Sequence, residues 1–321
     1  TPARALKPLF PLVGQHREWP AVTRVGKSQP SMAFLAGPWP ARITWGLLPL
    51  LLGPALGDAL GDHSVAVART GSGLAWLAWA GVLVAVVLPT TVSLTALRIA
   101  APAALAVANW AAITGEGGVP GAAAVTGGAL AVVAAFSPLT GDVFIDGSAY
   151  GDERRFALRV PTALLVGPVP LAGIAAVAAP IAGPLLLAAG QWVAGALVLA
   201  IGLPVAVVAI RALHGLARRW VVLVPAGLVL HDPHTLVEAV LLPRAMIRRL
   251  GPAAAGATDR RDLTAAALGL ALELDLVEPA VISPRRPDRT VQVEAVTRLA
   301  FTPTRPGALL AAARQRRIAT G

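Results

Sequence analysis

The sequence predicts an α-helical polytopic membrane protein of about six spans, followed by a small cytoplasmic α+β domain. The first reason is a run of 51 consecutive uncharged residues between Arg159 and Arg211, which has room for two membrane-spanning helices and a turn. The second is composition, because only 14% of residues are charged, whereas soluble domains carry roughly 25%. The third is segregation of charge, since 16 of the 27 Lys and Arg residues lie from Arg211 onward.

Apolar stretches along the first two thirds of the chain define the predicted spans. A helix needs about 20 apolar residues to cross a bilayer, which the long uncharged run supplies twice. Four spans remain possible if the first segment is re-entrant and the third is interfacial. The six spans are placed at residues 43–60, 74–92, 99–114, 121–138, 160–179 and 184–210.

Basic residues set the predicted orientation. With both termini inside, the internal segments and tails hold 26 of the 27 Lys and Arg residues, and the external loops hold only Arg69. The positive-inside rule therefore predicts a multi-pass plasma-membrane protein whose termini are both cytoplasmic. The same rule accounts for the basic N-terminal tail, residues 1–42, and for the overall positive charge, so we expect no nucleic-acid partner.

Five tryptophans lie near the ends of predicted spans. Amphipathic indole rings favour the membrane–water boundary, so we expect an interfacial belt rather than a ligand cage. These residues are Trp45, Trp76, Trp79, Trp110 and Trp192.

The character of the chain changes after the last span. Residues 220–230, WVVLVPAGLVL, form two apolar runs around a Pro-Ala-Gly turn, which indicates a strand, a turn and a strand. Partial alternation at 270–276 and 291–301 predicts further strands, and 306–318 reads as a helix with a basic C-terminal half. The chain thus divides into a tail (1–42), a membrane domain (43–212) and a cytoplasmic α+β domain (213–321).

This last domain opens with RRWVVLVPAGLVLHD, continues with short strands and closes on a helix, over residues 218–318. In that order of elements it resembles bacterial pleckstrin-homology-like domains. The resemblance implies a docking surface for protein or lipid rather than a catalytic centre, and it identifies no site residues. The bias toward Ala, Gly, Pro, Val and Arg is similar to that of integral membrane proteins from high-GC actinobacteria.

The first predicted span carries Gly53, Gly57 and Gly61 at four-residue spacing. Such spacing lets helix backbones approach closely in lipid, so these glycines are candidates for helix packing. The alternative is that glycine is simply frequent, with 32 in the chain.

Two short clusters were considered as metal sites. Asp58, Asp62 and His63 offer oxygen and nitrogen ligands, but carboxylates at an exposed helix end are usually solvated. The HDPH segment at 231–234 offers two imidazoles without a third ligand, and Asp-Pro is itself a turn signal. Because the chain also has no cysteine, we expect neither a metal nor another cofactor.

The internal segment 141–160, GDVFIDGSAYGDERRFALRV, combines acidic and basic residues. Its Asp-x-x-x-Asp spacing is similar to part of the lipid headgroup transferase pattern, but the rest of that pattern is missing. We expect a structural or docking loop that turns at Asp146-Gly147. Arginines near the span ends should lie at one interface and contact lipid phosphate, a partner, or acidic loop residues such as Asp152 and Glu153. They are Arg154, Arg155, Arg159, Arg218 and Arg219.

These observations favour a non-enzymatic membrane scaffold or accessory protein whose basic cytoplasmic domain binds anionic lipid or a protein partner. From residue 213 onward 15 arginines face nine acidic residues, a net charge of +6. The alternative is a transporter subunit or envelope-lipid enzyme that uses proline-interrupted spans and the 141–160 segment. A buried ionisable residue would favour it, and the sequence indicates none. The oligomeric state stays open.

Overall fold

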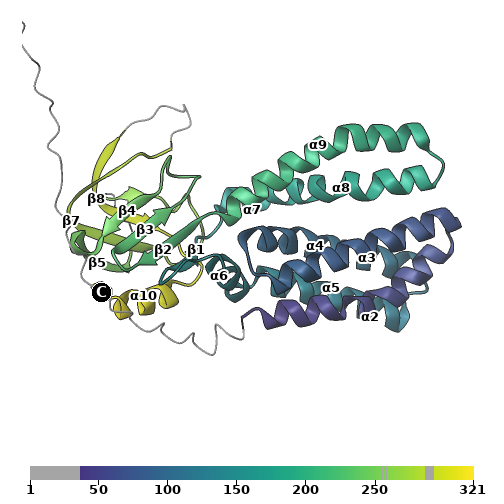
Figure 1. Cartoon of the computed structure of the whole chain (residues 1–321), viewed down its shortest axis with the longest axis horizontal. Coiled ribbons are helices and arrows are strands. Elements are labelled where there is room, and N and C mark those ends of the chain that lie inside the picture. The colour runs from purple at the N-terminus through teal and green to yellow at the C-terminus, as the bar shows by residue number, and fades with distance from the viewer. Residues whose placement is uncertain (1–36, 255, 258, 286–292) are drawn as a thin grey trace, which may run out of the picture. The chain divides into compact units, whose positions relative to one another are not determined.

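A computed structural model describes residues 37–254, 256–257, 259–285 and 293–321, so most of the predicted basic tail lies outside the described residues. Within these described residues, six helices are long and apolar enough to cross a membrane, which agrees with the number predicted from the sequence. Figure 1 shows how these helices are arranged. Each has 19 to 26 residues, and the third predicted span, which looked short, belongs to a helix of 24 residues. The six are α2 (Trp39–Gly61), α3 (Val65–Val87), α4 (Thr91–Thr114), α5 (Gly118–Phe136), α8 (Pro168–Ala188) and α9 (Trp192–Ala217).

The turn between the last two long helices lies later than predicted. The predicted spans place the break between residues 179 and 184, but Pro180 and Pro184 both lie inside the continuous helix α8. The helix ends instead at Ala188 with Ala189 as its cap, and Gly190, which follows the cap, has a φ of 77°, a left-handed conformation that glycine adopts readily. The amides of Gly190 and Gln191 donate to the carbonyls of Leu187 (3.0 Å) and Leu186 (2.9 Å), which is the Schellman pattern of helix termination.

The glycines at which the long helices pack closely are not the three predicted from the sequence. A Cβ on Gly202 of α9 would lie 2.3 Å from the Cβ of Ala179 on α8, and one on Gly128 of α5 would lie 2.8 Å from the Cα of Leu105 on α4. Only glycine permits such approach of helices in these places. By contrast, nothing lies within 4 Å of a Cβ built on any of the predicted glycines, which are Gly53, Gly57 and Gly61. These three therefore make no close helix contact within the described part of the chain.

Two of the predicted belt tryptophans join helices instead. The indole nitrogen of Trp45 donates to the carbonyl of Trp79, and that of Trp79 donates to the carbonyl of Trp45, both at 3.0 Å. Trp45 is buried, so its ring contacts protein rather than lipid. The reciprocal pair satisfies both indole donors while it links α2 to α3. Trp76 and Trp192 remain exposed.

The C-terminal part is a sheet domain of two four-stranded sheets followed by helix α10 (Pro306–Gln315). The first sheet is an antiparallel series in the order β1-β2-β3-β4, and the second has the order β5-β7-β8-β6, in which only β6 and β8 pair in parallel. Their strands are β1 (Arg154–Ala157), β2 (Trp220–Val224), β3 (Gly227–His231), β4 (Val240–Pro243), β5 (Ile247–Pro252), β6 (Arg261–Asp262), β7 (Leu272–Ile282) and β8 (Glu294–Phe301).

The internal segment contributes to both parts of the molecule. Its first half forms helix α6 (Pro138–Asp146), which ends at Asp146 with Gly147 as its cap. Its second half supplies β1, which pairs with β2 so that Phe156 lies opposite Val221. The short helix α7 (Thr162–Val166) then leads into α8. The sheet domain therefore includes a strand that precedes the predicted boundary at residue 213.

The two faces of the first sheet are covered differently. Phe156, Val221 and Leu223 point into a core that both sheets and α10 share. On the opposite face, Ala157 and Trp220 belong to an apolar cluster with residues of α2, α3, α4, α5 and α6. This second cluster joins the sheet domain to the helices, and burial of apolar surface stabilises the joint.

Candidate functional site

The candidate site is the junction where the long helices meet the sheet domain. Only Arg218 and Arg219 separate the end of α9 from the start of β2. The two residues differ sharply, because Arg218 is exposed whereas Arg219 is 1% exposed. A connection this short allows little independent movement between α9 and the sheet domain.

Arg219 forms the most buried ion pair of the described residues. Its Nε and Nη2 donate to the Oδ1 and Oδ2 atoms of Asp232, both at 2.7 Å, and its Nη1 donates to the carbonyl of Arg159 at 2.7 Å. Burial opposes ionisation of Asp232, but the hydrogen bonds and charge of Arg219 outweigh it and lower the pKa of this carboxyl. Arg219 was expected to contact lipid or a partner, and its buried position removes it from that set.

Asp142 links α6 to the end of the sheet domain. Its Oδ1 accepts hydrogen bonds from the amide of Ala157 (3.4 Å) and the hydroxyl of Thr304 (3.2 Å), and its Oδ2 lies 3.4 Å from Nη1 of Arg305. Burial raises the pKa of Asp142 to about 6, although Arg305, Ala157 and Thr304 act in the opposite direction. The carboxyl with this raised pKa lies where α6, β1 and the start of α10 meet.

A half-buried arginine of α4 interacts electrostatically with this carboxyl. Arg98 donates through Nε to the carbonyl of Ala135 at 3.4 Å, its guanidinium lies 5.6 Å from the ring centre of Phe136, and it interacts electrostatically with Asp142. The sequence analysis had placed Arg98 between two spans. The observed α4 begins at Thr91, so Arg98 lies inside a membrane-length helix.

The arginines of the internal segment have local partners. The backbone amide of Arg155 donates to Oδ1 of Asp146 at 2.7 Å, and Nη2 of Arg155 lies 3.2 Å from Oε2 of Glu153. Its guanidinium also lies 5.4 Å from the ring centre of Trp220. Arg154 lies over Phe156 at 5.5 Å. Both arginines are half-buried, so the internal segment is a folded part of the junction.

Arg159 and Arg218 are the two exposed arginines of the predicted set. The hydrogen bond from Arg219 to the carbonyl of Arg159 joins the two backbone segments, so Arg159 lies close to Arg218, the neighbour of Arg219 in sequence. Arg159 precedes α7 and α8, and Arg218 follows α9. Two basic side chains that are far apart in sequence therefore lie near the two ends of one helical hairpin. Within the described part of the chain, neither makes an ion pair.

The residues considered as metal ligands are placed apart or engaged elsewhere. Among the described residues, no group of three His, Asp or Glu side chains could hold a metal ion. Asp232 of the 231–234 segment is bound by Arg219, and the ring of His231 stacks on Trp220 with 4.9 Å between centroids. His63 lies 6.3 Å from the ring of Trp110.

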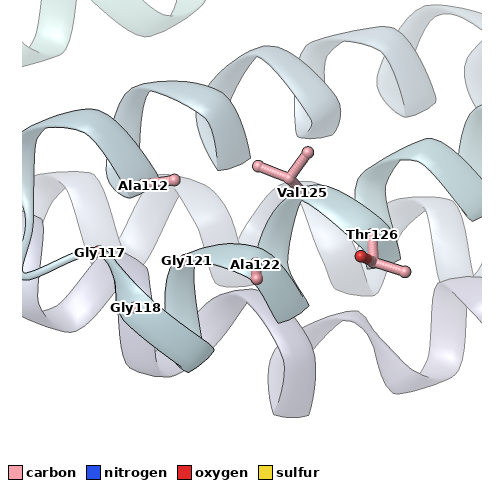
Figure 2. Close-up of a pocket in the computed structure, with 7 residues that line it drawn as sticks. All are labelled: Ala112, Gly117, Gly118, Gly121, Ala122, Val125 and Thr126. Carbon is pink, nitrogen blue, oxygen red and sulfur yellow. The ribbon is translucent and has the colours of Figure 1, made fainter.

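A depression of about 440 Å³ lies at the other end of α4, where α4 turns into α5. Figure 2 shows that its lining is made of small side chains with one hydroxyl, that of Thr126. Such a lining offers apolar contact and a single hydrogen bond. The lining residues are Ala112, Gly117, Gly118, Gly121, Ala122, Val125 and Thr126.

Sequence reasoning identified Asp142 only as one of several acidic residues in a loop and did not expect Arg98 inside a span. One signal was present: Asp142 is followed directly by Val143, Phe144 and Ile145, a setting typical of a buried segment. Comparison with protein-family models, with curated proteins and with solved structures finds no match for this chain. The geometry of the junction therefore carries the functional argument.

Proposed function

We propose that this protein is a non-enzymatic membrane scaffold whose cytoplasmic sheet domain docks onto the anionic lipid headgroups of the membrane that its six helices cross. The observation that carries the proposal is the pair of exposed arginines, Arg159 and Arg218, at the two ends of the α7–α9 segment. Arginine near the end of a span reaches the headgroup layer and attracts anionic lipid at about 1 kcal/mol for each charge.

The junction supports a fixed orientation of the domain. The Arg219–Asp232 pair, the contacts of Asp142 and the apolar cluster around Trp220 all join the sheet domain to the helical part. A domain held in this way presents the same residues to the headgroups at all times. Binding then requires little additional ordering of the chain, which favours affinity.

The proposal includes the resemblance to pleckstrin-homology-like domains, which rests on the order of elements in the sheet domain. Two small, mainly antiparallel sheets are followed by a C-terminal helix, α10, whose residues Leu309 and Ala313 enter the core between them. The resemblance implies docking rather than catalysis, and we infer the same role here. The basic balance of the sequence from residue 213 onward, with 15 arginines and nine acidic residues, is consistent with an anionic surface.

A transporter subunit or envelope-lipid enzyme is the second candidate. The half-buried Arg98 inside α4 favours it, because ionisable groups within spans often have functional roles. However, Pro180 and Pro184 lie in an unbroken helix and do not interrupt it. The contacts of Arg98 with Ala135 and Phe136 also serve to join α4 to α5.

The test is lipid-dependent stabilisation of the full chain. The melting temperature of the protein in neutral detergent is measured after addition of phosphatidylglycerol or of phosphatidylcholine. A lipid that binds the folded state raises this temperature. We expect the anionic lipid to raise it more, and high salt to reduce the difference. The double variant Arg159→Gln/Arg218→Gln should lose most of that difference.

The matched control is Arg248→Gln/Arg314→Gln, which removes the same charge from β5 and α10, elements that carry no end of a span. It should keep the response of the parent. Equal stabilisation of the parent by the two lipids would overturn the proposal and turn attention to a protein partner. If only the control variant loses the lipid-dependent rise in melting temperature, then Arg159 and Arg218 are not the residues that bind anionic lipid, and the proposal is wrong on this point.

A further inference from the structure

An uncharged loop of the sheet domain lies against the segment that enters α8. The loop, residues 264–270, reads TAAALGL and connects β6 to β7. The hydroxyl of Thr162, the first residue of α7, donates to the carbonyl of Ala266 at 2.8 Å. The backbone of Gly269 lies so close to Arg159 that a Cβ built on Gly269 would be 2.8 Å from Nε of Arg159. These contacts fix the loop to residues 159–162, a few residues before the start of α8 at Pro168.

Large apolar side chains are exposed on both sides of this contact. Leu268 and Leu270 of the loop are 70% and 52% exposed, and Leu165 and Val166 of α7 are 49% and 83% exposed. Val166 lies only two residues before α8. Exposed apolar groups that adjoin the end of a membrane-length helix are suited to the boundary between headgroups and acyl chains.

The conformation of the loop is imposed by its surroundings. Ala265 and Ala266 have φ values of 51° and 55°, which are left-handed conformations that alanine seldom adopts. Strained backbone of this kind persists where neighbouring structure holds it, and it often marks a functional segment. Here the neighbouring structure includes the bond from Thr162, so the entry to α8 helps to hold the loop in place.

We infer that residues 264–270 form a membrane-inserting loop, in which Leu268 and Leu270 enter the bilayer surface beside α7. The occupant of this apolar surface is lipid, because it continues directly into a helix of membrane length and because Arg159 lies against the loop. Apolar side chains beside a basic residue are the usual composition of segments that lie in the membrane interface. The inference rests on the proposed placement of the six helices in the membrane, but it does not require an anionic lipid.

Depth-dependent quenching in neutral nanodiscs tests the loop directly. The chain has no cysteine, so Leu268→Cys creates a unique site for an environment-sensitive fluorophore. The labelled full chain is reconstituted in phosphatidylcholine with and without a nitroxide on the acyl chain, and iodide serves as the aqueous quencher. We expect severalfold stronger quenching by the nitroxide lipid than by iodide.

Val281→Cys is the matched control, because Val281 is 65% exposed and lies on β7, outside the loop. Its label should respond mainly to iodide. The inference is overturned if the two labels are quenched alike by iodide, since Leu268 then faces water. It is also overturned if the label at Leu268 is shielded from both quenchers, since protein then covers it. The nanodiscs contain only phosphatidylcholine, so the quenching result does not depend on whether the protein binds anionic lipid.

Discussion

Breaking the buried pair between Arg219 and Asp232 should strongly destabilise the sheet domain. In Asp232→Asn the guanidinium of Arg219 keeps its charge, and the folded structure leaves this residue only 1% exposed. Removing one partner of a buried ion pair typically costs about 3–5 kcal/mol, because the other charge stays buried and unpaired. The expected loss is a large part of the stability of a domain, which is about 5–15 kcal/mol in total.

Removing both partners should cost less than removing either one. In Arg219→Met/Asp232→Leu no buried charge remains, and replacement of such a pair by apolar residues is often neutral. The double variant still loses the bond from Arg219 to the carbonyl of Arg159 and the bond from the amide of His234 to Asp232. Each is worth about 1 kcal/mol, so we expect a total loss of about 2 kcal/mol.

Pulse proteolysis in urea measures these differences on the full chain in detergent, with a C-terminal tag that reports cleavage of the sheet domain. The parent, Arg219→Met, Asp232→Leu and the double variant Arg219→Met/Asp232→Leu form a cycle that isolates the coupling between the two side chains, and Asp232→Asn is measured beside them. Losses that simply add would refute the reasoning, because the pair would then contribute no coupling. A neutral Asp232→Asn would refute it as well.

Three further outcomes are expected. Because the folded pKa of Asp142 is raised from 3.8 to about 6, its stabilising contribution is fully present below about pH 4 and is lost as pH rises through about 6; about 1.4 kcal/mol of the total of about 3 kcal/mol is lost between pH 5 and pH 8, and Asp142→Asn should abolish this difference in urea unfolding at the two pH values. Gly202→Leu should destabilise α8–α9 packing by about 1–3 kcal/mol in a thermal melt, whereas Gly57→Leu should be neutral; destabilisation by the second change would indicate that another chain packs there. Reporter fusions at Thr1 and Gly321 should both read cytoplasmic, and one external reading would contradict the proposed orientation.

The sequence by itself determined the number of membrane-length helices and the presence of a separate sheet domain. Both follow from local properties: the length of an apolar run decides whether a helix can cross a bilayer, and the 220–230 segment carries its own turn. It did not determine where α8 ends. Proline is tolerated within membrane helices, and the decisive feature was the left-handed conformation of Gly190.

Only the tertiary structure decided which charges are buried. Arg218 and Arg219 are adjacent and chemically identical, yet one is exposed and the other pairs with Asp232 across the first sheet. Likewise, Asp142 is buried because β1 and the start of α10 close over α6, and α10 is distant from α6 in sequence. Burial and pairing depend on contacts between remote segments, so a charge in a sequence predicts a position near the membrane surface but not the partner that it finds there.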